Sequence, residues 1–549
     1  MVLERIRASA VDDRAPASDH EPRKRRPQTS AAVGPGRAAI TGFVAGASGI
    51  AAGELLAGTL PGLPSPVIAV GTLVIKLQPP WAKDVVVGLF GTNDKLALNI
   101  AVLLAGLLVA SLIGLVGRRS YAWAVGAFSV FGGISLVGAV NAELVPLPAA
   151  LIASAITVVV ASSALWLLSP DATRRGVVRM RGAASRADGE GAADPFRRQF
   201  LIRSLTILAG AVLAGSLGRY LLNRAHPAGS PVSATLPKAG STVAPLNSDV
   251  QLSAPGLTPL VTANSDFYRI DTSLLVSQID ASTWQLKISG MVDHPRTYSY
   301  ADLRAMPQIE QYVTLACVSN TVGGNLVGNA LWTGARLKEI LAAAGVQAGA
   351  TQIVGRSIDG FTVGFPTSWA MDPSREPMVA LGMNREPLPA EHGYPARLIV
   401  PGLYGYVSAT KWLGELELTT REKFDGSWVQ FGWYKDGPIL TESRIDHPAD
   451  EAKLPAGPTW IDGMAWAPDR GIIRVEVRID NGPWSQAEIS RAISKATWVQ
   501  WMWLWQADSG DHAIEARATD GTGEVQTSTF TQANPGAATG YPSIKVTVT

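Results

Sequence analysis

The 549-residue chain is poor in the side chains that hold most protein-bound metals, with one cysteine, Cys317, and six histidines. A lone cysteine cannot form a disulfide within the chain, and it cannot supply the four thiolates of an iron–sulfur cluster. The histidines are His20, His226, His294, His392, His447 and His512. None of them lies in a long apolar run, which excludes a haem held by two histidines inside a membrane. We therefore expect no haem on this chain.

Charged side chains are also scarce. They make up 17% of the chain and the formal net charge is +2, whereas hydrophobic residues make up 47%. The net charge favours no particular partner, and we expect no nucleic acid ligand. The chain is too long for a single domain, and its apolar share indicates that part of it lies in a lipid bilayer.

Five apolar runs have about the 20 residues that a helix needs to cross a bilayer. They cover residues 38–60, 95–117, 121–141, 147–169 and 199–222. Residues 61–93 are apolar but interrupted by Lys76 and by two prolines, so we expect short helices at the membrane interface there, with a sixth span as the alternative. Glu54 is ionisable within the first run, which indicates either a hydrogen bond between helices or a proton or partner site.

Arginine clusters determine the expected orientation. With five spans, the basic tail at 1–36, the pair Arg118 and Arg119, and the loop at 174–198 all fall on one side, which the positive-inside rule assigns to the cytoplasm. We expect the tail to be disordered. The predicted protein is a multi-pass protein of the cell membrane with a cytoplasmic N-terminus and its C-terminal half outside the cytoplasm.

Arg197 and Arg198 directly precede the last apolar run. This pair resembles a twin-arginine export signal, which suits a domain that folds before export. No small-residue cleavage site follows Leu222, so the run is expected to stay as an anchor. An ordinary basic cap on a membrane helix is the alternative.

The composition predicts further divisions after the transmembrane region at 37–222. Residues 223–260 are rich in Pro, Ser, Ala, Gly and Thr and are typical of a linker. In 261–447, β-like runs alternate with helix-like pieces such as 334–343, which predicts an α+β domain. Short alternating strands in 456–549 predict an immunoglobulin-like β-sandwich. One of its strands carries Trp498, Trp501, Trp503 and Trp505, which indicate core or an interface patch.

Cys317 follows the apolar run 312–315 and precedes a loop that begins at Ser319. It is therefore expected at the end of a buried strand, facing a loop. Its chemistry stays open between a small buried hydrophobe, a thiolate nucleophile with a nearby base, and a soft-metal ligand.

Six separated stretches resemble motifs of the sulfite oxidase family of molybdenum–molybdopterin enzymes, in the same order. They are 316–320 around the cysteine, 327–337 (G-x-W-x-G-x-x-L), 384–389 (N-G-x-P-L-P), 392–397 (H-G-x-P-x-R), 401–405 (P-G-x-x-G) and 410–413 (x-K-W-x). Stretches in 456–549 likewise resemble that family's dimerisation domain. The resemblance implies a sulfite-oxidase-type molybdopterin fold in 261–447 and a homodimer formed through the C-terminal domain.

The resemblance also implies roles for individual residues. Cys317 would be the thiolate ligand of molybdenum, with two further sulfurs from the pterin dithiolene. The residues that match cofactor-binding positions are Asn264, Tyr268, His392, Arg397, Thr410 and Lys411. Cations and polar donors suit the pterin phosphate. Arg269 matches an arginine that binds the substrate anion, and an ion pair or helix cap is the alternative for it.

Two departures from the family concern the substrate. Val322 stands five positions after the cysteine, where sulfite oxidases carry an arginine, and Phe361 stands in place of a tyrosine. A less basic pocket would bind a sulfite dianion poorly. Residues 264–271 are also similar to the periplasmic methionine sulfoxide reductases, so a neutral oxide is a second candidate.

The sequence therefore predicts a membrane-anchored oxidoreductase that transfers an oxygen atom on a small sulfur or nitrogen compound outside the cytoplasm. Its electrons would pass to a separate carrier, such as a cytochrome or a quinone-linked protein. A methionine sulfoxide reductase-like activity is the alternative. Further alternatives are a papain-like hydrolase using Cys317 and His392, and a binding module that retains the fold without the chemistry.

Overall fold

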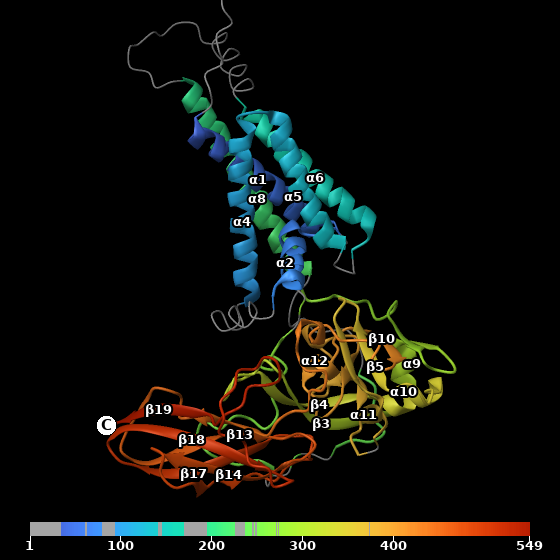
Figure 1. Cartoon of the computed structure of the whole chain (residues 1–549), viewed down its shortest axis with the longest axis vertical. Coiled ribbons are helices and arrows are strands. Elements are labelled where there is room, and N and C mark those ends of the chain that lie inside the picture. The colour runs from blue at the N-terminus through green and yellow to red at the C-terminus, as the bar shows by residue number, and fades with distance from the viewer. Residues whose placement is uncertain are drawn as a thin grey trace, which may run out of the picture.

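The computed structural model describes residues 34–60, 63–79, 94–140, 145–169, 195–225 and 236–549, with gaps at 244–245, 247–249, 271, 273 and 373. A bundle of long helices forms one end of the molecule, and two β-rich domains form the other (Figure 1). Several predicted features lie outside the described residues. These are the basic tail at 1–33, residues 80–93, most of the loop at 174–198, the linker residues 226–235, and both His20 and His226.

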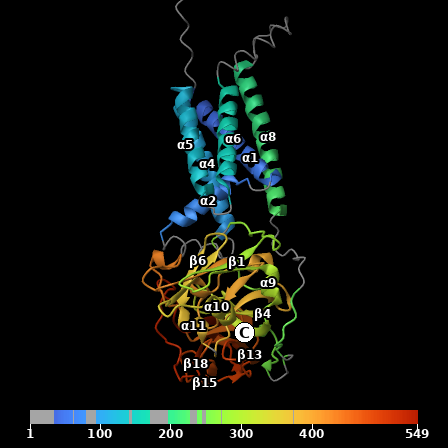
Figure 2. The same ribbon diagram turned by 90° about the vertical axis from the view of Figure 1, so that its right-hand side faces the viewer.

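Five helices among the described residues are long and apolar enough to cross a membrane, as the sequence predicts. They are α1 (Pro35–Thr59), α4 (Asp94–Gly117), α5 (Tyr121–Val140), α6 (Leu147–Leu167) and α8 (Pro195–Ala225). They suggest multi-pass anchoring in a membrane. A further helix of the bundle, α2 (Pro66–Leu77), has 12 residues and is too short to span a bilayer. It lies at the end of the bundle nearest the β-rich domains (Figure 2).

Helix α1 is the centre of the bundle and packs against α4, α6 and α8. Glycines make these approaches possible. A Cβ atom on Gly42 of α1 would lie 2.7 Å from the Cα of Gly114 in α4, and one on Gly58 would collide with the carbonyl oxygen of Gly218 in α8. Small residues at helix contacts are typical of membrane bundles, where close backbone packing replaces the hydrophobic effect.

Glu54 of α1 joins three helices. Its carboxylate Oε1 accepts a hydrogen bond from the Ser65 hydroxyl at 2.5 Å and one from the Val67 amide at 3.3 Å, at the N-terminus of α2. Its Oε2 lies 3.4 Å from Nη1 of Arg219 in α8. Of the two interpretations left open by the sequence, these contacts favour the structural one, because the carboxylate is already bound by neighbouring helices.

We expect Glu54→Ala to destabilise the full-length chain in detergent by about 1–3 kcal/mol, because it leaves buried donors on Ser65 and Val67 without an acceptor. Glu54→Gln keeps a carbonyl acceptor in the same place and should lose less. The unfolding temperature of each variant, followed by circular dichroism at the helix band, checks this. Equal temperatures for Glu54→Ala and the wild-type chain would contradict it.

The first β-rich domain contains one mixed sheet, in which β1 and β10 are parallel, and one antiparallel sheet. One has the strand order β2-β1-β10-β5-β6, and the other β3-β4-β7-β8 with β9 paired to β7. The strands are β1 (Gln285–Gly290), β2 (Arg296–Ser299), β3 (Gln308–Ala316), β4 (Val327–Arg336), β5 (Gln352–Ser357), β6 (Thr362–Pro366), β7 (Met378–Met383), β8 (Glu386–Pro387), β9 (Arg397–Ile399) and β10 (Leu413–Thr419). The short helices are α9 (Tyr300–Ala305), α10 (Leu337–Ala344), α11 (Thr367–Met371), α12 (Gly405–Ser408), η3 (Ala390–His392) and η4 (Val429–Phe431).

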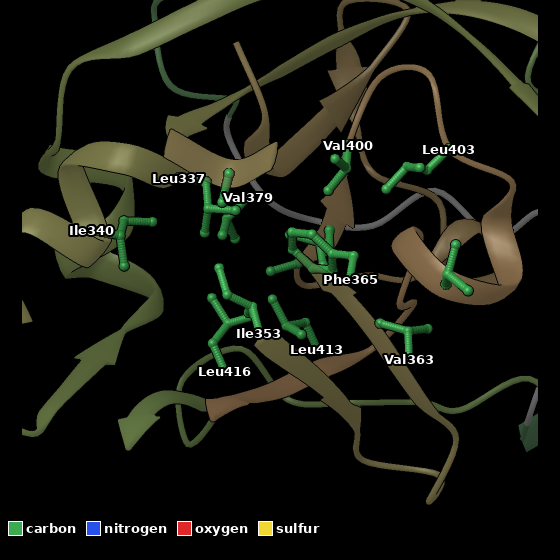
Figure 3. Close-up of a cluster of buried hydrophobic side chains, with 14 of the residues drawn as sticks. Leu337, Ile340, Ile353, Val363, Phe365, Val379, Val400, Leu403, Leu413 and Leu416 are labelled. Atoms are coloured by element: carbon green, nitrogen blue, oxygen red, sulfur yellow. The ribbon is translucent and has the colours of Figure 1, made fainter. Parts of the chain in front are cut away.

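Apolar side chains from both sheets and from α10 meet in one core. Figure 3 shows Leu337 and Ile340 of α10 facing Ile353 of β5 and Leu416 of β10, with Phe365 of β6 beside them. All five side chains are fully buried. The α+β prediction is confirmed, although the predicted helical piece at 334–343 begins only at Leu337, because the preceding residues complete β4 by pairing with β7.

The second domain is a sandwich of two sheets, with the orders β11-β13-β17-β16 and β12-β19-β18-β14-β15. Its strands are β11 (Glu442–His447), β12 (Ala452–Leu454), β13 (Gly457–Trp466), β14 (Ile472–Ile479), β15 (Ser485–Gln486), β16 (Glu488–Ile489), β17 (Val499–Ala507), β18 (Gly510–Asp520) and β19 (Ser543–Val548). Strand β11 pairs with β13 along its length. The sandwich therefore begins at Glu442, whereas the sequence places residues up to 447 in the first domain.

The predicted linker is also more structured than its composition indicates. Residues 250–260 run between the two domains, where Val250 and Leu260 are buried. Gln500 of β17 accepts a hydrogen bond from the Leu252 amide at 2.9 Å and donates one to the Thr258 carbonyl at 2.7 Å. Trp498 donates from Nε1 to the Leu260 carbonyl at 2.8 Å. The Leu252 amide and the carbonyls of Thr258 and Leu260 thus find partners at β17 and the residue before it.

The tryptophans of β17 and the residue before it belong to the interior. Trp498, Trp501 and Trp505 are buried, and Trp503 packs partly against the sandwich core. The core interpretation of this cluster is therefore confirmed for the three buried side chains. Trp498 differs from the others because it packs in the core of the first domain.

Candidate functional site

Cys317 directly follows β3, as the sequence predicts, and opens a loop that returns to β4. The β3–β4 ladder ends at the pair of Ala316 with Val327. The Cys317 amide then donates to the Leu326 carbonyl at 2.9 Å. Asn320 holds the loop from inside, because its amide donates to the Cys317 carbonyl at 3.0 Å and its side-chain oxygen accepts from the Leu326 amide at 2.9 Å. The backbone of Cys317 is therefore fixed by these hydrogen bonds.

The sandwich domain buttresses β3 three residues before the cysteine. The Thr314 amide donates to the Ala496 carbonyl at 2.9 Å, and the Trp498 amide donates to the Thr314 hydroxyl at 2.8 Å. That hydroxyl also donates to the side-chain oxygen of Asn329 on β4, at 3.2 Å. All these groups are buried. The second domain thus contributes to the rigidity of the strand that presents Cys317.

Tyr268 lies close to the sulfur. A Cβ atom on Gly405 would lie 3.9 Å from the Tyr268 hydroxyl and 3.8 Å from the carbonyl of Ala316, which precedes the cysteine. Burial raises the pKa of Tyr268 above its ordinary value, the Cys317 sulfur raises it further, and Arg397 lowers it. The fold therefore brings the cysteine stretch, Tyr268 and the stretch of Arg397 to one place. Phe267 stacks on Tyr268 at 5.2 Å between ring centroids.

Arg397 is a buried cation, with 5% of its surface exposed. Its Nη1 donates to the His392 carbonyl at 3.1 Å, and its guanidinium lies 4.9 Å from the centre of the Trp332 ring. The Nε of Arg397 has no hydrogen-bond partner among the described residues. No carboxylate of those residues lies within ion-pair distance of the guanidinium. Burial lowers the pKa of Arg397 to about 10.

The Thr410 hydroxyl is a second buried polar group with no partner among the residues that the structure describes. The strand of Arg397 and the segment of Thr410 are joined, because the Leu398 amide donates to the Thr410 carbonyl at 2.9 Å. The Thr410 hydroxyl lies against Gly355 of β5, where a Cβ atom would be 2.5 Å from it. Buried polar groups are normally paired, so the unpaired Nε of Arg397 indicates a place for a ligand with acceptor oxygens.

His392 is buried and electrically neutral at physiological pH. Its Nε2 lies 2.8 Å from the Asn264 carbonyl, which can only accept, so Nε2 carries the proton and Nδ1 keeps a free lone pair. Burial lowers the pKa of His392 to about 4, and the charges of Arg397 and Lys411 lower it too, although the bond to Asn264 raises it.

Asn264 acts through its backbone. Its side-chain oxygen accepts from Asn384 at 2.9 Å, and its amide nitrogen donates to Glu386 at 3.1 Å and to the Met383 carbonyl at 3.4 Å. The side chain predicted to contact a cofactor is therefore engaged with protein groups. Its carbonyl orients His392 instead.

Lys411 approaches Arg397 because a glycine stands between them. Gly393 has a φ of 110°, and a Cβ atom there would lie 2.9 Å from the Lys411 Cα and 3.2 Å from the Arg397 Cβ. Only glycine combines this backbone conformation with so close an approach. The Lys411 ammonium lies 3.2 Å from the Glu391 carbonyl.

Three other positions singled out in the sequence have different surroundings. Arg269 is half-buried next to Tyr268. Phe361 lies in the turn between β5 and β6 and packs against the main core. Val322 lies in the Cys317 loop and lines a pocket.

That pocket has a volume of about 280 Å³ and lies between the Cys317 loop and the sandwich. Val322 and Gly323 line it on one side, and residues 438–443, Arg470, 524–527 and 538–540 on the other. Arg470 is neutralised by Asp520, whose Oδ2 lies 2.6 Å from its Nε. Burial raises the pKa of Asp520, but hydrogen bonds from Thr522, Arg470 and Thr441 outweigh it and hold the pKa well below its ordinary value.

Sequence reasoning missed two residues of this site, Tyr404 and Glu442. The Tyr404 hydroxyl donates to Oε1 of Glu442 at 2.7 Å, and Glu442 lines the pocket. Burial raises the pKa of Glu442 to about 7, although Tyr404 and polar contacts with Asn320 and Trp466 lower it. Tyr404 lies in a stretch that resembles a family motif, whereas nothing near Glu442 in sequence marks it.

Comparisons with known proteins show the family of the chain. Residues 273–428 match the family described as oxidoreductase molybdopterin binding domain. The uncharacterized oxidoreductase YuiH of Bacillus subtilis is 33% identical over 166 residues, which cover 30% of this chain and 80% of YuiH. The chain belongs to the sulfite oxidase-like family of molybdopterin-dependent oxidoreductases.

Two further relatives place it within that family. Mitochondrial sulfite oxidase of Mus musculus is 29% identical over 317 residues, which cover 49% of this chain and 58% of that protein. An NADH nitrate reductase of Oryza sativa is 32% identical over 193 residues, covering 30% of this chain and 20% of that protein. The chain thus spans a little over half the length of the mouse sulfite oxidase. It is a molybdopterin oxidoreductase of the sulfite oxidase and nitrate reductase type, and its matched domain implies a molybdenum–molybdopterin cofactor.

We expect the neutral His392 to make the cofactor-free protein less stable in acid. Its pKa is about 4 in the folded state and 6.5 as the ordinary value, so between these values the unfolded chain binds one more proton. Stability therefore falls as the pH drops from about 7 to 4, by about 3 kcal/mol in total. Unfolding followed by tryptophan fluorescence across this range measures the loss.

The control for this prediction is a pair of variants. His392→Gln should flatten the acid dependence, whereas His294→Gln, at an exposed histidine, should leave it unchanged. An unchanged slope in His392→Gln would contradict the assignment of a buried neutral imidazole.

Proposed function

We propose that the protein is a membrane-anchored molybdenum enzyme that transfers an oxygen atom on a small sulfur or nitrogen compound outside the cytoplasm. The observation that carries this proposal is Arg397, a buried guanidinium whose Nε lacks a partner among the described residues. A buried cation without a counter-charge costs several kcal/mol. The phosphate of a pterin cofactor would offset this cost with charge-assisted hydrogen bonds.

The residues of the site fit the cofactor in chemical type. Cys317 would supply one thiolate to the metal, which suits a cofactor that brings two sulfurs of its own. Arg397, Lys411 and Thr410 would hold the phosphate. His392, neutral and oriented by the Asn264 carbonyl, offers its Nδ1 as an acceptor for a pterin N–H. When bound, the cofactor supplies the two-electron chemistry of oxygen-atom transfer.

Tyr268 and Arg269 would complete the wall of the site. The Tyr268 hydroxyl is held protonated by burial near the sulfur, which raises its pKa, so it serves as a hydrogen-bond donor. Arg269 follows it in the chain and is the candidate for an interaction with the substrate.

The pocket next to Val322 favours a neutral oxide over sulfite. Its one arginine among the described lining residues, Arg470, is neutralised by the ionised Asp520, and Val322 adds no charge. A sulfite dianion would lose its hydration there without gaining a counter-charge. A sulfoxide or an N-oxide needs only hydrogen bonds to its oxygen, so an activity like that of a sulfoxide reductase is the second candidate.

The membrane orientation follows from charge. The C-terminal end of α4, which Arg118 and Arg119 directly follow, lies at the end of the helix bundle opposite the β-rich domains (Figure 1). If that end is cytoplasmic, the molybdenum domain lies outside the cytoplasm. There it would exchange electrons with a separate carrier, such as a cytochrome or quinone-linked protein, and could pair with a second copy through the sandwich.

The test is the metal and pterin content of the full-length protein purified from a host that makes the cofactor. We expect about one molybdenum and one pterin per chain in the wild type. Cys317→Ser should lose oxygen-atom transfer while retaining pterin, because the phosphate contacts remain. Arg397→Met should lose both pterin and molybdenum.

Lys338→Met, at a surface lysine that pairs with Glu376, is the matched control and should keep the full content. Wild-type protein without molybdenum or pterin, or Arg397→Met with normal content, would contradict the proposal.

A further inference from the structure

Glu442 lies at the contact between the two β-rich domains. It begins β11 of the sandwich, yet its carboxylate faces the first domain, where it accepts the hydrogen bond from Tyr404. The Tyr404 hydroxyl in turn accepts from the Leu440 amide at 3.4 Å, and the Tyr404 amide donates to the Gly437 carbonyl at 2.7 Å. The Glu442 side chain is therefore held by groups from both domains.

The Glu442 carboxylate connects the pocket with the surroundings of the cysteine. On one side it lines the pocket together with Val322 of the Cys317 loop. On the other side it contacts Tyr404, whose pKa burial and Glu442 raise well above its ordinary value, with a smaller contribution from Cys317. Tyr404 therefore keeps its proton and serves as the donor to Glu442.

Among the titratable groups around the pocket, Glu442 is the one that can exchange a proton near neutral pH. The charged or titratable neighbours are Tyr404, Cys317, Arg470, Asp520 and Glu524. Arg470 and Asp520 neutralise each other, and Glu524 is exposed to solvent at the far wall of the pocket. On β11 itself Arg444 pairs with Asp446. Because burial raises the pKa of Glu442 to about 7, a useful fraction of the carboxyl is protonated at neutral pH.

We propose that Glu442 donates a proton to the oxygen atom of a neutral oxide bound in this pocket. The inference rests on the proposed function, which supplies the electrons. In the reduction of a sulfoxide, the substrate takes up two protons and two electrons and gives a sulfide and one water molecule. As the sulfur–oxygen bond breaks, the Glu442 carboxyl provides one proton and solvent the other, and the two electrons are those that the reduced cofactor would supply when bound. Solvent then protonates Glu442 again through the pocket.

The experiment uses the full-length molybdenum-loaded enzyme, with dimethyl sulfoxide as substrate and a reduced viologen as electron donor. In the wild type, kcat/KM should fall about tenfold per pH unit above pH 7 as Glu442 ionises. Glu442→Gln keeps an acceptor for Tyr404 but carries no acidic proton. We expect its kcat to fall by about 10²–10⁴, with KM and molybdenum content unchanged and the alkaline limb of the profile lost.

Two further variants separate proton donation from a structural role. Tyr404→Phe removes a hydrogen bond that lowers the pKa of Glu442, so the alkaline limb should move to higher pH. Glu524→Gln removes the other carboxyl of the described pocket lining and should retain the limb at its wild-type position.

The inference is overturned if Glu442→Gln keeps the wild-type limb, or if it loses molybdenum, which would make Glu442 a structural residue. A limb that does not move in Tyr404→Phe would also oppose it. Failure of the proposed function is a different result, namely a fully loaded wild-type enzyme that transfers oxygen neither from the oxide nor to sulfite.

Discussion

The backbone ladder between β3 and β4 is the constraint on which the site depends. Its last pair joins Ala316 to Val327, and the following bond from Cys317 to Leu326 closes a short loop around Asn320. A sulfur held in this way loses little conformational entropy when it binds a metal, because the chain has already ordered it. The sandwich adds a second support through Thr314, so both domains position the same atom.

The second organising feature is electrostatic. The first domain buries the guanidinium of Arg397 without a carboxylate partner among the described residues, and places Lys411 beside it through Gly393. This arrangement does not increase the free energy of unfolding, because burying a charge without a partner costs free energy. Burial and the same two cations keep His392 neutral by lowering its pKa. A site that costs stability is typical of function, and the partner that we propose for Arg397 is an anion.

The sandwich also contributes residues to the pocket beside the Cys317 loop. Arg470 and Glu442 both come from it, and they face the Cys317 loop across a space of about 280 Å³. The charge in this space is therefore decided by the contact between two domains. Val322 adds no charge, and Asp520 offsets the charge of Arg470, so the described lining has no uncompensated cation.

The sequence by itself determined the features that depend on local pattern. Five apolar runs predict five long helices because a bilayer demands a continuous apolar length. Cys317 is found at a strand end because β-branched and apolar residues precede it and polar loop residues follow. The ordered motifs around His392, Arg397 and Lys411 predict a cofactor site at these residues.

Only the tertiary structure decided the features that depend on distant partners. Residues 250–260 have the composition of a linker, yet they are ordered by hydrogen bonds with Gln500 and Trp498, more than 230 residues away. No sequence motif lies next to Glu442. Its protonation depends on burial by Tyr404 and the pocket wall, which raises its pKa. Burial and hydrogen bonding between remote segments are properties of the fold, so no local pattern can encode them.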